Sequence, residues 1–132
     1  MMYRFFVRIF AAGDSPTAAA PLPVTFEEAL ERLAQLPQMF IEPDGAFVWR
    51  PLPEVAERWQ VDGNLFDRGE SLFYVELKGS CPVKQFDEIL ACLTQEPIAF
   101  AFEWVERGLL MNESTFRQMA ANPLFPDSPR GD

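Results

Sequence analysis

Residues 26–40 read FEEALERLAQLPQMF, and residues 86–100 read FDEILACLTQEPIAF, sixty positions further along the chain. Seven of these fifteen aligned positions are identical. Each copy places apolar residues at helical spacing and then reaches a proline, which predicts a helix that ends near Pro37 or Pro97. Strand-like runs precede and follow both copies, so each half of the chain is predicted to be strand, helix, strand. The sequence therefore predicts an internal duplication of a βαβ unit.

Two βαβ units in tandem resemble the outline of the ferredoxin-like fold. We therefore expect an α+β chain, a ferredoxin-like two-layer sandwich, that forms a single domain of 132 residues. The half-repeats are predicted at residues 3–50 and 70–106. Residues 51–69 have no counterpart in the second copy and are expected to form an inserted hairpin or arm. A short C-terminal helix and a tail are expected over residues 107–132.

Caps and turns support these elements. Thr25 is expected to cap the first helix, with Glu28 completing a capping box. Pro43-Asp44-Gly45 predicts a hairpin turn, and further turns are predicted at Asp62-Gly63-Asn64 and at Arg68-Gly69-Glu70. Four leucines at matching helix positions are expected among the most buried side chains: Leu30, Leu33, Leu90 and Leu93.

The chain is acidic and contains no histidine. Its formal net charge is -9 and its pI is near 4.5, so a phosphate backbone would be repelled and nucleic acid is not expected as a partner. Without histidine, His-based catalytic triads and the commonest zinc ligand are excluded. The sequence also lacks a phosphate loop, zinc-ligand spacing and a dinucleotide-binding glycine pattern. We therefore expect no metal and no cofactor.

The two cysteines are the remaining candidates for reactive groups. Cys81 is expected where a strand passes into the second helix, and a helix N-terminus stabilises a thiolate, so Cys81 is the best single candidate for a nucleophile. No histidine base accompanies it, which favours a turn cysteine without a catalytic role. Cys92 lies eleven residues further along the chain and is expected to pack in the core. On one helix the two would stand roughly 16 Å apart, too far for a disulfide.

Neither secretion nor membrane insertion is expected. Arg4 and Arg8 interrupt the apolar run at the start of the chain, so it is interpreted as a strand and not as a signal peptide. No stretch approaches the roughly 18 apolar residues of a transmembrane helix. Together with the absence of a predicted disulfide, this favours a reducing compartment, and the expected location is the cytoplasm.

One face of the predicted sheet combines aromatic and charged residues. Residues 3–10 and 72–78 are expected to be parallel neighbours, with Phe5, Val7, Ile9, Phe73, Val75 and Leu77 directed toward the helices. The opposite face then carries Arg4, Phe6, Arg8, Phe10, Tyr74, Glu76 and Lys78. A large uncovered apolar face is rare on a monomer. It is therefore expected to be a binding face, covered by residues 51–69 and the final helix or by a second subunit.

Aromatic residues on two central strands resemble the sheet of RNA-recognition domains, where they stack bases. Neither strand carries the glycine-rich signature of that family, and the net charge has the opposite sign, so RNA is not expected to bind.

The sequence therefore predicts a small acidic protein with a non-catalytic binding or interaction role. Its open sheet face would hold a protein partner, a second copy as a homodimer, or a small ligand. One alternative is an immunity-type or inhibitor protein that neutralises a basic effector. Another is a small enzyme that uses a carboxylate or Cys81, completed across a dimer interface.

Overall fold

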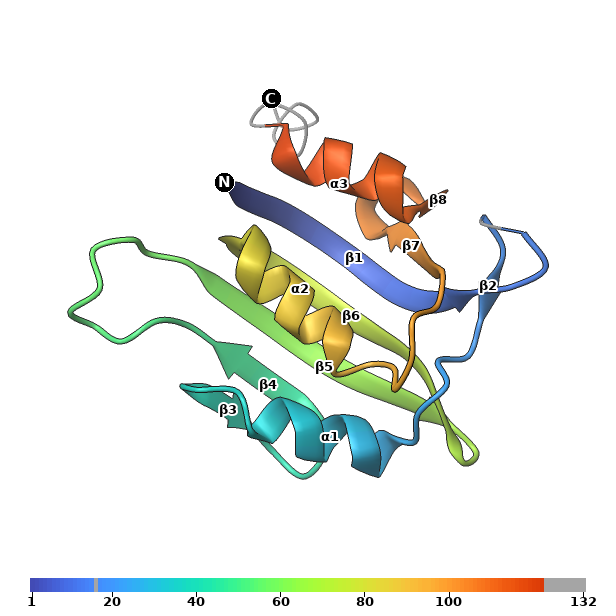
Figure 1. The fold of residues 1–132 in the computed structure, drawn as a ribbon, viewed down its shortest axis with the longest axis horizontal. Helices are drawn as coiled ribbons and strands as arrows, with labels where there is room; N and C mark the ends of the chain where they lie inside the picture. Colours follow the sequence, from blue (N-terminus) through green and yellow to red (C-terminus); the bar gives the residue numbers. More distant parts are fainter. Residues whose placement is uncertain (16, 123–132) are drawn as a thin grey trace.

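The computed structural model describes residues 1–15 and 17–122, so the predicted tail over 123–132 lies outside the described residues. Figure 1 shows the elements in chain order: β1 (Met2–Ala12), β2 (Ala19–Ala20), α1 (Phe26–Ala34), β3 (Met39–Ile41), β4 (Ala46–Trp49), β5 (Gln60–Arg68), β6 (Ser71–Pro82), α2 (Val83–Ala91), β7 (Phe100–Trp104), the 3-10 turn η1 (Val105–Arg107), β8 (Leu109–Asn112) and α3 (Glu113–Ala121). Each of these α-helices has nine residues, so none is long enough to cross a membrane.

The strands form one open sheet of eight strands. Its order is β3-β4-β5-β6-β1-β7-β8, with β2 paired to the end of β1, and every pairing is antiparallel. The helices α1, α2 and α3 pack on the same face of this sheet (Figure 1). The chain therefore has a mixed α+β fold, with a layer of helices on a layer of sheet.

The two long central strands are neighbours, as expected, but they are not parallel. Met2 of β1 pairs with Pro82 of β6, and Ile9 pairs with Val75, so the two strands run in opposite directions. Strand β6 lies between β1 and β5 and is antiparallel to both, so β1 and β5 run in the same direction. The tight turn at Gly69 then reverses the chain into β6. The expectation of a parallel pair was wrong because it ignored this strand.

Residues 51–69 are not an insertion outside the sheet, because residues 60–68 form β5, which lies between β4 and β6 and makes a hairpin with β6. Val61 and Leu65 of β5 are buried on the helix side of the sheet. Gly63 lies between them and is covered by the ring of Phe47, which occupies the space that a Cβ atom would need. The turn predicted at Asp62-Gly63-Asn64 was therefore wrong: this glycine makes room for a neighbouring ring inside a strand.

The internal duplication is not confirmed by the positions of the elements. Helix α1 begins at Phe26, whereas α2 begins at Val83, three residues before the repeat position Phe86. The strands that follow the two copies also lie in different places, since β3 is an edge strand and β7 lies beside β1. The sequence repeat therefore does not mark two strands in equivalent positions of the sheet.

Local signals were read correctly at the first helix and at two turns. The Thr25 hydroxyl accepts a hydrogen bond from the Glu28 N–H, and the Glu28 carboxylate accepts one from the Thr25 N–H, which confirms the capping box. The hairpin turns at Pro43-Asp44-Gly45 and Arg68-Gly69-Glu70 are confirmed. Leu33, Leu90 and Leu93 are buried as predicted, whereas Leu30 is only partly buried at the edge of the core.

The expected C-terminal helix is confirmed as α3, which closes the core on the helix side of the sheet. The Phe116 ring stacks on Phe102, with centroids 4.4 Å apart, and on Phe86, with centroids 5.2 Å apart. Arg117 holds the same helix in place by donating hydrogen bonds to the Tyr3 hydroxyl and to the Asp87 carboxylate. Helix α3 is therefore part of the main core, and it does not cover the opposite face of the sheet, as one expectation had it.

Candidate functional site

The candidate site is the sheet face turned away from the helices, which we call the open face. Residues directly opposite one another in an antiparallel pair share a face, so the strand register identifies its members. They are Arg4, Phe6, Arg8 and Phe10 on β1, Tyr74, Glu76, Lys78 and Ser80 on β6, Gln60, Asp62, Asn64 and Phe66 on β5, Ala46 and Val48 on β4, Phe40 on β3, Ala101 and Glu103 on β7, and Leu110 and Asn112 on β8. No helix in the described part of the chain covers this face.

An ion-paired arginine occupies the middle of the open face. Arg8 donates a hydrogen bond from Nε to Glu76 Oε1 at 3.0 Å, and its Nη1 lies 3.5 Å from Glu103 Oε1. The hydrogen bond to Glu76 raises the pKa of the Arg8 guanidinium. Because all three side chains are partly exposed, this group contributes little to folding. Its effect is to hold three long side chains in fixed positions across β6, β1 and β7.

Four aromatic residues gather at one end of the face. The ring of Tyr74 stacks on Phe66 with centroids 4.7 Å apart, and it contacts Phe10 at 5.2 Å and Phe73 at 5.3 Å. Phe10 is buried under these neighbours, whereas Phe66 is 38% exposed. Arg68 lies over the ring of Phe73, 3.9 Å from its centroid. We call Phe10, Phe66, Phe73 and Tyr74 the aromatic cluster.

Phe73 was expected in the core, and the structure corrects this. The register between β5 and β6 shifts between Phe66 and Asp67, because Phe66 pairs with Tyr74 and Asp67 pairs with Leu72. Such a bulge adds one residue to β6, so that Leu72 becomes the core residue and Phe73 joins the aromatic cluster. A bulge leaves no simple signature in residue alternation, which explains why the sequence pattern missed it.

The other predicted residues of the face lie at its opposite end. Lys78 is exposed, and its Nζ lies 5.0 Å from the centroid of the half-buried Phe6 ring. Arg4 is exposed and lies opposite Ser80. The structure therefore places the seven predicted residues on two adjacent strands, with Arg8 and Glu76 between the Phe6–Lys78 pair and the Phe10–Tyr74 pair.

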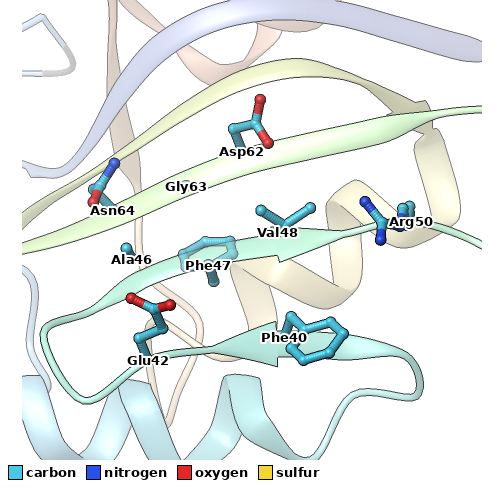
Figure 2. Close-up of a pocket in the computed structure, with 9 residues that line it drawn as sticks. All are labelled: Phe40, Glu42, Ala46, Phe47, Val48, Arg50, Asp62, Gly63 and Asn64. Carbon is cyan, nitrogen blue, oxygen red and sulfur yellow. The ribbon is translucent and has the colours of Figure 1, made fainter.

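Sequence reasoning missed a hollow on the open face above β3, β4 and β5 (Figure 2). Its volume is about 470 Å³. Phe40 and Val48 provide apolar surface, and Phe40 is 73% exposed. Asp62 and Asn64 of β5 line the hollow from the other side, and Arg50 lies at one end. The signal was the alternation of Asp62 and Asn64 with the buried Val61 and Leu65, which was obscured because residues 51–69 were interpreted as an arm.

The reactive-cysteine hypothesis does not fit the structure. Cys81 is fully buried at the end of β6, opposite Tyr3, and burial raises the pKa of its thiol to about 12. Cys92 is also buried, and burial raises its thiol pKa to about 11. Both thiols are free in the structure, with Cys81 in β6 and Cys92 at the end of α2. The expectation that the helix N-terminus would activate Cys81 was wrong, since its side chain points into the core.

Within residues 1–15 and 17–122, no three or more histidine, cysteine or acidic side chains lie close enough together to hold a metal ion. Comparisons with protein-family models, with curated proteins and with solved structures found no match to this chain.

Proposed function

We propose that this chain is a non-catalytic interaction domain that binds another protein surface through the open face. The observation that carries the proposal is a set of partly exposed aromatic residues, Phe6, Phe66, Phe73 and Tyr74, on a face that no described helix covers. Aromatic residues concentrated on one patch with charges around them are typical of protein interfaces. The charges at the centre are already paired with each other, so an apolar surface can approach without leaving Arg8 unpaired.

The spread of the apolar groups favours a protein surface over a small ligand. Phe40 on β3 and Phe6 on β1 are separated by four strand spacings, roughly 19 Å at about 4.8 Å per spacing. Small-ligand sites bury most of their ligand within one concavity. The hollow beside Phe40 is only one part of a much wider face. In this proposal it receives one side chain of the partner protein.

We also propose that the central part of the fold is a ferredoxin-like sandwich. Its support is the order β7-β1-β6-β5, in which the connection from β1 to β5 contains α1 followed by β3 and β4, and the connection from β6 to β7 contains α2. Each crossover joins two parallel strands that flank an antiparallel strand, which is a split βαβ unit. In this proposal the duplicated units are β1-α1-β5 and β6-α2-β7, and β3, β4, β8 and α3 are additions. The fold alone carries no information on function.

The interaction is tested by replacing two aromatic residues of the open face together, Phe6→Ser and Tyr74→Ser. Their partial exposure means that the fold should survive, while self-association, or capture of a partner in a pull-down, should weaken by about tenfold or more. The matched control is Leu52→Ser with Val55→Ser, which removes two exposed apolar side chains from the loop beside α2. Unchanged circular dichroism must accompany both variants. Equal binding by both double variants would contradict the proposal.

A further inference from the structure

The open face is electrically balanced although the chain is strongly acidic. Its basic side chains are Arg4, Arg8 and Lys78, and its acidic side chains are Asp62, Glu76 and Glu103. These three charges of each sign cancel, whereas the full chain has 11 basic and 20 acidic residues. The remaining 8 basic and 17 acidic residues carry the whole net charge of -9. Adding the flanking residues Glu42, Arg50 and Arg68 makes the count five basic and four acidic, which leaves the face close to neutral.

This distribution discriminates between the candidate partners. A basic effector would be attracted to the acidic surfaces elsewhere on the chain and would gain little from a neutral face. Two copies of a chain with a net charge of -9 repel each other through most of their surfaces. A charge-balanced face such as the open face lets two copies approach with less repulsion than their acidic surfaces do. Charge therefore favours a second copy over a basic partner.

The residues along the two central strands are arranged symmetrically about Arg8 and Glu76. On β1, Arg8 lies midway between Phe6 and Phe10, and on β6, Glu76 lies midway between Lys78 and Tyr74. A two-fold axis in the interface plane, crossing the strands at Arg8, would place Phe6 of one copy over the aromatic cluster of the other, in which Phe10 is the buried member. The same axis places each Lys78 opposite the other copy's Tyr74, a cation facing an aromatic ring. It also places each Arg8 opposite the Arg8 of the other copy, where both guanidinium groups keep their ion pairs with Glu76 and Glu103. A patch that complements its own rotated copy is the requirement for a symmetric dimer.

We infer that the occupant of the open face is a second copy of this chain, in a two-fold symmetric dimer with the sheets face to face. This inference rests on the proposed function and names its partner. The open face is large enough for a dimer interface. Six strand spacings by six residue rises give an area of roughly 600 Å², compared with the roughly 800 Å² that each partner buries in a standard interface. The short edge strands β3 and β8, with three and four residues, are poor templates for edge-to-edge pairing, which leaves the face as the route to assembly.

The chain contains two lysines, and they make a matched pair of variants. Lys78 is exposed on the open face, and Lys84 is exposed on α2, on the opposite side of the sheet. Lys78→Glu and Lys84→Glu change the net charge by the same amount. Sedimentation equilibrium of the full chain should give twice the monomer mass of 15.1 kDa for the wild type. Lys78→Glu should raise the dimer dissociation constant by about tenfold or more, and Lys84→Glu should leave it nearly unchanged.

Other outcomes would overturn the inference, and they separate it from the proposed function. Equal weakening by Lys78→Glu and Lys84→Glu would mean that the dimer does not use the open face. A monomeric wild type would also refute the second copy. If that monomer captures another protein, and Phe6→Ser with Tyr74→Ser abolishes the capture, the interaction domain stands with a different partner. If the wild type is a dimer and the Phe6/Tyr74 variant dimerises equally well, both proposals fail.

Discussion

Replacing Phe116 by alanine should lower the free energy of unfolding by about 3 to 5 kcal/mol. The ring is completely buried, and it stacks on Phe102 with the two planes only 5° apart. It is also the main anchor of α3, because the only other buried residue of that helix is Ala120. Removing the ring therefore leaves a cavity between the helix and the sheet. Denaturant unfolding followed by tryptophan fluorescence measures the loss, with Trp104 close by as the reporter, its ring centroid 6.0 Å from that of Phe116.

Gln118→Ala is the matched control for Phe116→Ala, because Gln118 is exposed on the same helix. It should change the stability by no more than about 0.5 kcal/mol. If Phe116→Ala shifts the unfolding midpoint no further than this control does, α3 is not part of the core and the helix layer described above is wrong.

Gly79→Ala should destabilise the chain by about 3 kcal/mol or more. Gly79 lies in the middle of β6 with φ of +135°, a backbone conformation that side chains rarely adopt. An added Cβ would also overlap the carbonyl oxygen of Gln60 on the neighbouring strand β5. Both effects act in the centre of the sheet, where neither strand can move away. Thermal unfolding followed by circular dichroism measures the loss.

Gly69→Ala provides the comparison for Gly79→Ala. Gly69 has φ of +63° in the exposed turn between β5 and β6, and no atom lies within 4 Å of the position where a Cβ would be added. In Gly69→Ala the only cost is that alanine must adopt the left-handed backbone conformation, which lowers the stability by about 1 to 2 kcal/mol. Equal losses in the two variants would show that the overlap with Gln60 is not present in the folded chain.

The sequence predicted the elements whose signals are local. The capping box at Thr25 and the turns at Gly45 and Gly69 each depend on a few adjacent residues, and they form as expected. The pairing of strands depends on residues far apart in the sequence, and there the predictions failed. Strand β5 was missed because the sequence around Gly63 is typical of a turn. In the structure Gly63 lies inside β5, where the absence of a side chain makes room for the Phe47 ring of β4. Without β5, the direction of β6 relative to β1 could not be derived.

The same distinction applies to the candidate site. Alternation along β1 placed Phe6, Arg8 and Phe10 on one face, because a strand without bulges alternates strictly. The Phe40 side of the face was not predicted, since its members come from β3, β4 and β5, and β5 was not recognised as a strand. The orientation of Cys81 could have been predicted. It lies four residues after Leu77 on β6, and that spacing directs both side chains toward the core.

Hydroxyl-radical footprinting of the full chain, at protein concentrations above and below the dimer dissociation constant, tests most directly whether the open face is the interaction surface. We predict that Phe6, Phe40 and Tyr74 lose reactivity as the concentration rises. Leu52 and Leu109 are exposed away from the open face, and their reactivity should stay constant. Protection of Leu52 or Leu109, with Phe6, Phe40 and Tyr74 equally reactive at every concentration, would contradict the account.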